Sequence, residues 1–130
     1  MTVMLDTNTC IYAMKGSAGF TPRVALIDCG ISIIVMGELE YGVARSVRVE
    51  QNRAALIAFL NSVRLYSLEP ETAMHYGRIR ARLAEQGQLI GNNDMWIAAH
   101  ALSIDASLIT HNTAEFSRVP NLSIDSWMKD

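Results

Sequence analysis

Apolar residues alternate along the chain between short unbroken runs and longer stretches with helical spacing. The short runs are typical of strands that are covered on both faces of a parallel sheet. They predict strands at Val3–Leu5, Ile31–Val35, Leu65–Leu68, Ser107–Thr110 and Leu122–Ile124.

Between the runs, apolar residues recur three and four positions apart, as they do on one face of an amphipathic helix. This spacing predicts helices over Gly37–Val47, Gln51–Val63 and Pro70–Gln86. Thr21 and Pro22 are a typical helix start and predict an earlier helix that Gly30 closes. Gly87 supplies the stop of the helix that begins at Pro70.

A further helix is predicted over Asp94–Ile104, capped by Asn92 or Asn93, and a single turn is predicted near Thr113–Phe116. Strands and helices thus alternate, which favours right-handed crossovers and an open parallel sheet between helical layers. In such sheets ligands bind beyond the carboxyl ends of the strands.

Length and composition indicate one ordered domain over residues 1–130, because half of the residues are apolar. The longest apolar run, Ala54–Leu60, is far shorter than the roughly 18 to 20 residues that cross a bilayer. The first residues have no basic segment and meet an acid at Asp6, unlike a secretory leader. We therefore expect a cytoplasmic protein.

Charge and cysteine content exclude two further classes. The net charge is −2, from 11 basic and 13 acidic residues, so any phosphate binding must be local and not through bulk positive charge. Cys10 and Cys29 have no further cysteine partners, which argues against a disulfide scaffold or a cysteine-rich zinc site. We expect both to be buried thiols.

Five polar residues fall where the predicted strands end or the next helices begin. Asp6 directly follows the first strand, and Glu38 and Asp94 are predicted in the first turns of their helices. Asn112 follows the strand at Ser107–Thr110 by two residues, with Glu115 one helical turn further on. We expect these side chains at one edge of the sheet.

Each acid alone has a simple structural explanation. Asp6 can be an N-cap, and a carboxylate in a first helical turn stabilises the helix through its favourable interaction with the helix dipole. Together, however, clustered carboxylates repel one another unless a cation neutralises them or one is protonated. Oxygen ligands without histidine or thiolate favour Mg²⁺ or Mn²⁺.

The chain carries a set of motifs in a fixed order that resembles the PIN-domain ribonucleases and, among them, the VapC-type toxins. These motifs are Asp6-Thr7-Asn8, residues 37–42, residues 91–101, residues 110–116 and Trp127. The resemblance implies a three-layer α/β/α sandwich with a central, mostly parallel five-stranded sheet. It also implies Mg²⁺- or Mn²⁺-dependent cleavage of RNA, a homodimer, inhibition by a VapB-like antitoxin, and DNA contact only through that antitoxin.

Carried over onto this sequence, the resemblance implies a site made of Asp6, Glu38, Asp94, Asn112 and Glu115. Asp6 and Asp94 are expected to hold the metal, and Glu38 to orient or deprotonate a metal-activated water for in-line attack. Asn112 stands where many PIN domains have aspartate, and with Glu115 it would complete the outer shell. The lower charge favours a single cation in the absence of substrate.

Several polar residues near these motifs have two interpretations. Thr7 and Thr110 either hold a water or phosphate oxygen or, as we favour, cap local backbone. We expect His100 to be a packed core histidine and Glu40 to be solvated or salt-bridged. Arg78 and Arg82 share a helix face, while Arg80 faces elsewhere. The shared face either guides RNA or pairs with acids such as Glu85.

Two other functions remain open at this point. One is a catalytically silent PIN-fold protein that only binds an antitoxin, which Asn112 favours. The other is a small Mg²⁺-dependent phosphatase, against which Asn8 counts because an Asp-x-Asp strand end would be expected. For the antitoxin, we expect a basic side chain among the acids and an apolar groove near Tyr12, Met14 and Leu39.

Overall fold

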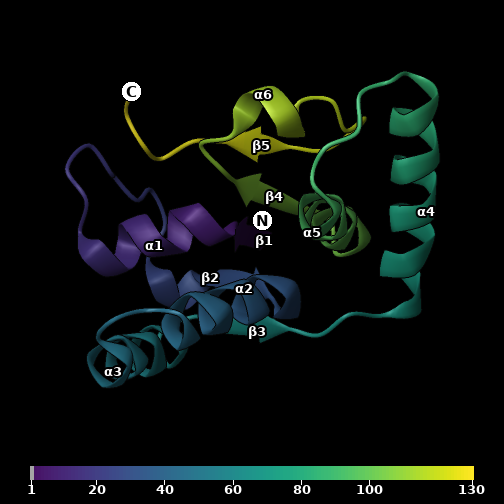
Figure 1. Cartoon of the computed structure of the whole chain (residues 1–130). Helices are drawn as coiled ribbons and strands as arrows, with labels where there is room; N and C mark the ends of the chain where they lie inside the picture. Colours follow the sequence, from purple (N-terminus) through teal and green to yellow (C-terminus); the bar gives the residue numbers. More distant parts are fainter. Residues whose placement is uncertain (1) are drawn as a thin grey trace.

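The computed structural model describes residues 2–130, which form a five-stranded sheet whose paired strands are all parallel. The strand order is β3-β2-β1-β4-β5 (Figure 1). The strands are β1 (Thr2–Leu5), β2 (Cys29–Ser32), β3 (Arg64–Tyr66), β4 (Ala106–Ile109) and β5 (Ile124–Asp125). The sheet is therefore fully parallel where the sequence predicted a mostly parallel one.

Helices cover both faces of this sheet. In Figure 1 the strands are stacked from β5 at the top to β3 at the bottom, with α1 on the left and α4 and α5 on the right. The helices are α1 (Thr7–Lys15), α2 (Ile33–Ala44), α3 (Val49–Leu60), α4 (Pro70–Glu85), α5 (Asn92–Ser103) and α6 (Thr113–Phe116), with a 3₁₀ turn at Leu26–Asp28. This arrangement confirms the predicted α/β/α fold.

The central strand β1 aligns the ends of its neighbours. Val3 is in register with Cys29 of β2, and Leu5 is in register with Ile109 of β4. All four residues of β2 and of β4 are buried, as expected for strands between two helical layers. The residues that follow these strands therefore emerge at one edge of the sheet.

The strand predicted at Ile31–Val35 is wrong in its second half. β2 ends at Ser32, and the next three apolar residues form the first turn of α2. Ser32 caps that helix, since its hydroxyl accepts a hydrogen bond from the Ile34 amide at 3.1 Å. A run of apolar residues fits a buried strand and a buried helix equally well, so the pattern could not locate this boundary.

The helix predicted from Thr21 to Gly30 is also wrong. The Thr21 amide donates to the carbonyl of Trp127 at 2.8 Å, and Phe20 forms an antiparallel bridge with Met128. This segment is therefore held extended by the C-terminal residues, and only the short 3₁₀ turn follows it. Gly30 lies in β2 instead of closing a helix.

The remaining helices are present as predicted, with differences of one to four residues at their ends. α4 begins at Pro70 as predicted and ends one residue early, and Gly87 has the positive φ of 65° expected after a helix. α2 and α3 begin and end a few residues before the predicted bounds. α5 begins at Asn92 with Gly91 as its N-cap, so neither asparagine of the pair caps it. The single turn at Thr113–Phe116 is confirmed as α6.

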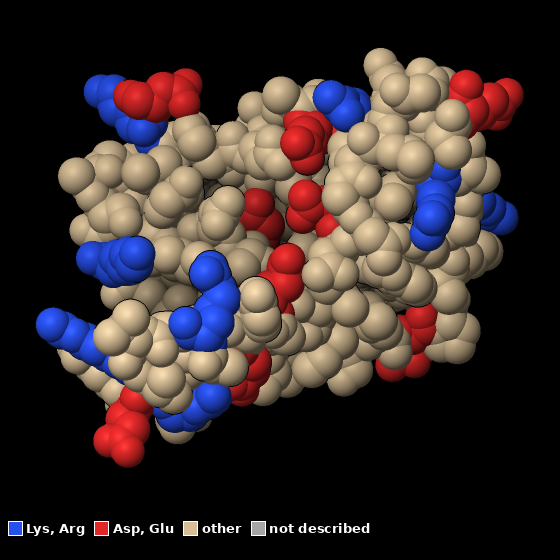
Figure 2. All heavy atoms as spheres, in the orientation of Figure 1, with Lys and Arg blue, Asp and Glu red and all other residues tan. Residues whose placement is uncertain are grey.

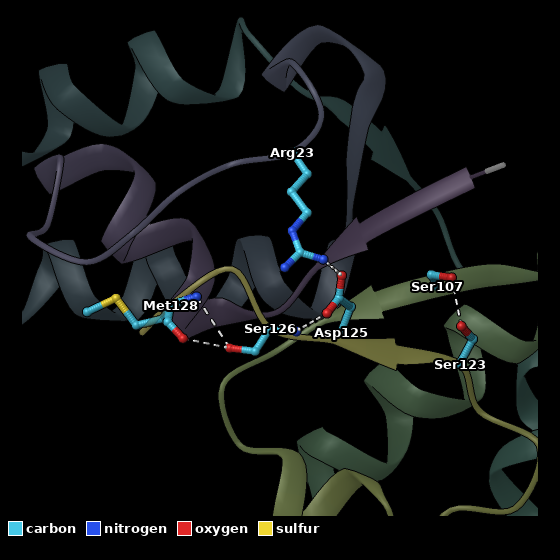
Figure 3. A network of polar contacts seen from close by, with 6 residues as sticks. All are labelled: Arg23, Ser107, Ser123, Asp125, Ser126 and Met128. Atoms are coloured by element: carbon cyan, nitrogen blue, oxygen red, sulfur yellow. Dashed lines mark hydrogen bonds and ion pairs between the residues drawn. The ribbon is translucent and has the colours of Figure 1, made fainter. Parts of the chain in front are cut away.

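The last strand lies slightly later than predicted, at Ile124–Asp125 instead of Leu122–Ile124. Figure 3 shows how its surroundings are tied together. Arg23 pairs with the Asp125 carboxylate at 3.1 Å, and the Ser107 and Ser123 hydroxyls are 2.9 Å apart. These contacts fasten the edge of the sheet to β4 and to the segment that follows α1.

The core contains the polar groups that the sequence assigned to it. Cys10 and Cys29 are buried and free, and burial is the main reason that their thiol pKa values are raised, that of Cys29 to about 11. His100 is buried, with Nδ1 2.8 Å from the Ser32 hydroxyl, and burial lowers its pKa. Among residues 2–130, no helix combines the length and apolar character needed to cross a membrane.

Candidate active site

Asp6 lies at the point where β1 passes into α1. Its backbone amide donates to the carbonyl of Ile109 at 3.1 Å, which ties the end of β1 to the end of β4. Its carboxylate caps α1 by accepting a hydrogen bond from the Thr9 amide at 2.9 Å. The N-cap interpretation is thus confirmed, and only 6% of the residue is exposed.

Glu38 lies in the middle of α2 and not in its first turn, because α2 begins earlier than predicted. Stabilisation of the helix dipole therefore does not explain this acid. Its carboxylate accepts a hydrogen bond from the Thr7 hydroxyl and a longer one, at 3.5 Å, from the Asn93 side-chain amide. Glu38 thereby joins α1, α2 and α5 at one point.

Asp94 lies in the first turn of α5 as predicted, and its pKa is raised to about 6. Burial is the largest cause of the shift. The negative charges that raise it further belong, in order of effect, to Glu38, Asp6 and Glu115. Three carboxylates from three other segments are therefore close enough to act on Asp94. Figure 2 shows acidic side chains gathered in a hollow near the middle of this face.

Asn112 and Glu115 lie at the short helix α6, Asn112 directly before it and Glu115 within it. Asn112 is its N-cap residue, although its side chain makes no capping hydrogen bond. The backbone amide of Asn112 donates a hydrogen bond to the Thr110 hydroxyl at 3.0 Å, so Thr110 caps local backbone, which is the role that we favoured. Glu115 joins the acidic group through its charge on Asp94. For Asn112 the structure gives only its place after β4.

Thr7 is the residue whose role the sequence misjudged. We favoured a capping role, but its hydroxyl donates to Glu38, 31 residues further along the chain. Asn93 was noted only as a cap and also contacts Glu38. Each residue stands next to a predicted acid in the sequence, Thr7 after Asp6 and Asn93 before Asp94. That position indicates that they lie near the site, but it does not indicate that Glu38 is their hydrogen-bond partner.

The secondary predictions have mixed outcomes. Glu40 pairs with Arg53 of α3, which confirms the salt-bridged alternative. Arg78 and Arg82 are exposed, and the part of the chain that the structure describes contains no ion pair between Arg82 and Glu85. Arg80 donates to the Tyr76 hydroxyl at 2.7 Å, beside the ring of Trp96, which stacks on Tyr76 at 3.9 Å between centroids.

A groove of about 890 Å³ lies between α1, α2 and α3, and Glu38 is the member of the acidic group that lines it. Met14 and Leu39 line it, as predicted. Tyr12 does not line it and packs instead against Phe20, with 6.2 Å between the ring centroids. The prediction is therefore correct for two of the three groove residues.

The acids are near enough for their charges to act on Asp94, but they do not form a tight cage around a metal position. Within residues 2–130, no three His, Cys, Asp or Glu side chains are grouped so that they could hold a metal ion between them. Two carboxylates together with waters and phosphate oxygens are nonetheless a usual ligand set for Mg²⁺. The assignment of Asp6 and Asp94 as metal ligands stays a prediction.

Comparison with known proteins decides the family. The family model of the PIN domain matches residues 3–122, which is most of the chain and includes every residue of the acidic group. The chain belongs to the PIN-domain family. The resemblance in the sequence motifs is therefore confirmed.

The PIN-domain relatives of this chain include VapC proteins of similar length. Ribonuclease VapC2 of Rickettsia felis is 40% identical over 134 residues, which cover 99% of this chain and 100% of that protein. The tRNA(fMet)-specific endonuclease VapC of Salmonella typhimurium is 35% identical and covers 95% of this chain and 96% of its own length. This chain is thus a PIN-domain protein of the VapC group.

Solved structures agree with this assignment. A chain of VapBC2 from Rickettsia felis, bound to a DNA fragment from its promoter, superimposes with a TM-score of 0.88 at 37% identity, covering 98% of this chain and 99% of that chain. A chain of VapBC-1 from nontypeable Haemophilus influenzae gives a TM-score of 0.84 at 38% identity, covering 99% and 100%. The α/β/α fold is therefore that of VapC structures.

Proposed function

We propose that this chain is a metal-dependent endoribonuclease that acts as the toxin of a toxin–antitoxin pair. The observation that carries the proposal is the raised pKa of Asp94, to which three further carboxylates contribute. A group of buried and half-buried acids that repel one another is unfavourable without a cation, so it is expected where the site serves chemistry. The names of the relatives, ribonuclease VapC and tRNA(fMet)-specific endonuclease VapC, point to RNA as the substrate.

We expect Asp6 and Asp94 to hold Mg²⁺ or Mn²⁺, directly or through water. The donors fit such a cation, because carboxylate oxygens are its preferred protein ligands and the surplus negative charge at Asp94 calls for neutralisation. When bound, the cation supplies Lewis-acid stabilisation of the charge that develops on the phosphate. Asn112 carries no charge, which favours one cation over two in the absence of RNA.

The protein groups have separate roles in the proposed reaction. Glu38 orients the attacking water and takes its proton during in-line attack on the phosphodiester. Thr7 and Asn93 fix the direction of the Glu38 carboxylate through their hydrogen bonds. Asn112 and Glu115 complete the outer shell of the site.

The proposed partner is a VapB-like antitoxin. The two VapBC assemblies described above support this pairing, and one of them is bound to promoter DNA as a complex. We expect any DNA contact of this chain to be indirect, through its antitoxin. We expect an antitoxin segment to lie on the apolar floor of the groove, near Met14 and Leu39, and to insert a basic side chain among the acids.

Three further properties are proposed on the same basis. We expect residues 1–130 to act as a single PIN domain, in the cytoplasm, and as a homodimer. Exposed apolar side chains such as Val47, Ile57 and Leu65 are available for contact between copies. Light scattering on the purified protein measures the oligomeric state directly.

Metal removal tests the proposed activity. Purified, antitoxin-free protein should cleave single-stranded RNA in Mg²⁺ or Mn²⁺ and should stop in excess EDTA, with activity restored by adding the metal back. A matched Asp6→Asn preparation controls for contaminating nucleases. Undiminished cleavage in EDTA would contradict the metal requirement.

A silent antitoxin-binding protein is the second candidate, and Asn112 is the observation that favours it. Loss of a carboxylate at this position lowers the charge available to a cation. This candidate predicts that the chain cuts no RNA with any divalent ion and does not arrest growth when expressed alone. The same cleavage assay therefore separates the two functions.

A further inference from the structure

The groove between α1, α2 and α3 is continuous with the candidate active site. Thr7, Glu38 and Asn93 line the groove and also form the hydrogen-bonded group around the Glu38 carboxylate. A ligand that lies along the groove therefore contacts Glu38, the member of the acidic group that lines it.

Two cationic side chains line the groove beyond its acidic end. Lys15 is the last residue of α1, and Arg45 is the C-cap residue of α2. Neither has an ion-pair partner among residues 2–130, whereas the nearby Arg53 is paired with Glu40. Lys15 and Arg45 are therefore available to an anionic ligand. Figure 2 shows basic side chains on the α1–α3 side of the acidic hollow.

Tyr41 adds an aromatic surface between the acids and these cations. It lines the groove and is 68% exposed, which leaves most of its ring open. The Arg45 guanidinium lies 5.5 Å from the ring centroid. Proteins that bind single-stranded nucleic acids commonly combine an open aromatic ring, on which a base stacks, with a guanidinium that pairs with phosphate.

Glu38, Tyr41 and Arg45 follow one another along α2 and its C-cap, in the order in which an RNA strand that leaves the acids would meet them. Glu38, Tyr41 and Arg45 are three and seven residues apart, which places them on one helix face. At 1.5 Å per residue, Arg45 lies about 10 Å along the axis from Glu38. A strand whose scissile phosphate is at the acids would therefore place its adjoining nucleotides over Tyr41 and Arg45.

We propose that Tyr41, Lys15 and Arg45 form a subsite for single-stranded RNA next to the acidic site, with a base stacked on Tyr41 and phosphates paired with the two cations. This inference rests on the proposed function and names where the flanking substrate is held. It assigns binding and not chemistry to these residues.

Lys15, Tyr41 and Arg45 form an exposed rim of the groove. The charge of this rim favours RNA over the antitoxin as its ligand. A basic group placed next to Lys15 and Arg45 is repelled by them, while the phosphates of an RNA backbone are attracted. The chain as a whole has a net charge of −2, so these local cations supply attraction that the bulk charge does not. The apolar floor of the groove remains suited to the antitoxin.

The test measures RNA binding without cleavage. Fluorescence anisotropy with a fluorescein-labelled single-stranded RNA oligonucleotide, in EDTA, gives the affinity over a range of salt concentrations. Lys15→Ala and Arg45→Ala should each reduce the slope of log K against log salt by about 0.7, the value for one phosphate contact on a single strand. Tyr41→Ala should weaken binding by about fivefold or more, and Tyr41→Phe should retain the wild-type affinity.

Arg64→Ala is the matched control, since Arg64 is an exposed arginine on β3 that does not line the groove. It should leave both affinity and salt slope unchanged. Because the assay contains no metal, the outcome does not depend on whether the chain cleaves RNA. Failure of the cleavage assay alone would overturn the proposed activity and leave the subsite standing.

Two results would overturn the subsite. One is an unchanged salt slope in both cation variants together with unchanged affinity in Tyr41→Ala. The other is a set of variants that bind RNA normally but lose affinity for the cognate antitoxin, which would assign the rim to that partner. All substituted residues are exposed, so circular dichroism is expected to report a native fold in every variant.

Discussion

The carboxylate of Asp6 has a structural role and a proposed chemical role at once. It caps α1 through the Thr9 amide, and its charge also helps to raise the pKa of Asp94. Asparagine caps helices about as well as aspartate does, so replacing the charge need not remove the cap. Substitution by asparagine thus separates the two roles.

We predict that Asp6→Asn and Asp94→Asn each reduce RNA cleavage by about a hundredfold or more, the scale of losing a metal ligand or its positioning group. Single-turnover cleavage in Mg²⁺ measures the loss. Asp105→Asn is the control, because Asp105 is exposed and has a positive φ of 54° that asparagine tolerates. Full activity in either site variant would remove that residue from the mechanism.

The raised pKa of Asp94 predicts a pH dependence of stability in the metal-free protein. Its ordinary value is 3.8 and its value in the fold is about 6. Between these values the folded protein binds more protons than the unfolded chain, so the free energy of unfolding falls as the pH rises through this window. Below about pH 4 both states are protonated, and the destabilisation is absent.

Urea unfolding in EDTA at several pH values measures this effect. Wild type should lose stability as the pH rises from about 4 to about 6, and Asp94→Asn should lose less over the same window. The difference between the two curves isolates Asp94 from the other titrating groups. Equal pH dependence in wild type and variant would mean that burial and the neighbouring charges do not raise the pKa of Asp94 in the folded protein.

Among the elements, the packing of the Tyr66 side chain of β3 against β2 depends on a glycine. A Cβ atom added at Gly30 would lie 2.2 Å from Cε2 of the Tyr66 ring. Gly30 pairs with Arg64 of β3, and Tyr66 is two residues further along that strand. That ring is half-buried and meets His100 edge-on, at 6.4 Å between centroids. Any larger residue at position 30 therefore has to displace a packed aromatic side chain.

We predict that Gly30→Ala lowers the free energy of unfolding by about 1 to 3 kcal/mol, as overpacked cores do. Gly77→Ala is the matched control, because Gly77 is exposed in the middle of α4 and has no atom within 4 Å of an added Cβ. It should raise the free energy of unfolding by about 1 kcal/mol. Denaturant midpoints measure both, and a stable Gly30→Ala protein would show that the Tyr66 ring moves freely.

Across the whole molecule, the charge is nearly neutral, yet four of the 13 acids, Asp6, Glu38, Asp94 and Glu115, come together, and Figure 2 shows acidic side chains in a hollow. Such a site attracts any cation of suitable geometry. A guanidinium from the antitoxin and a divalent metal ion therefore compete for the same carboxylates.

We predict that the affinity of the cognate antitoxin falls as Mg²⁺ is added, beyond the effect of ionic strength alone. Titration calorimetry in Mg²⁺ and in a monovalent salt of equal ionic strength measures the difference. Asp94→Asn should bind the antitoxin more weakly and should lose the Mg²⁺ sensitivity. An antitoxin that binds equally well under both conditions, with the acids open to solvent, would contradict shared occupancy.

Local sequence determined much of the fold and the composition of the candidate site. Pro70 and Gly87 bound α4 because proline favours a helix start and glycine tolerates a positive φ. Asp6 and Asp94 could be placed at the sheet edge since each directly adjoins a strand end or a helix start. These features depend on neighbours in the sequence, so a linear pattern contains them.

Tertiary structure decided what depends on distant partners. The segment at Thr21 has helix-starting residues but does not start a helix there, because Phe20 forms an antiparallel bridge with Met128 and the Thr21 amide donates to the carbonyl of Trp127. The Thr7 hydroxyl pairs with Glu38 across 31 residues of sequence, and β2 ends where Ser32 meets both the Ile34 amide and His100. Hydrogen-bonding groups take whichever partner the packed chain brings to them, and a one-dimensional pattern does not specify that partner.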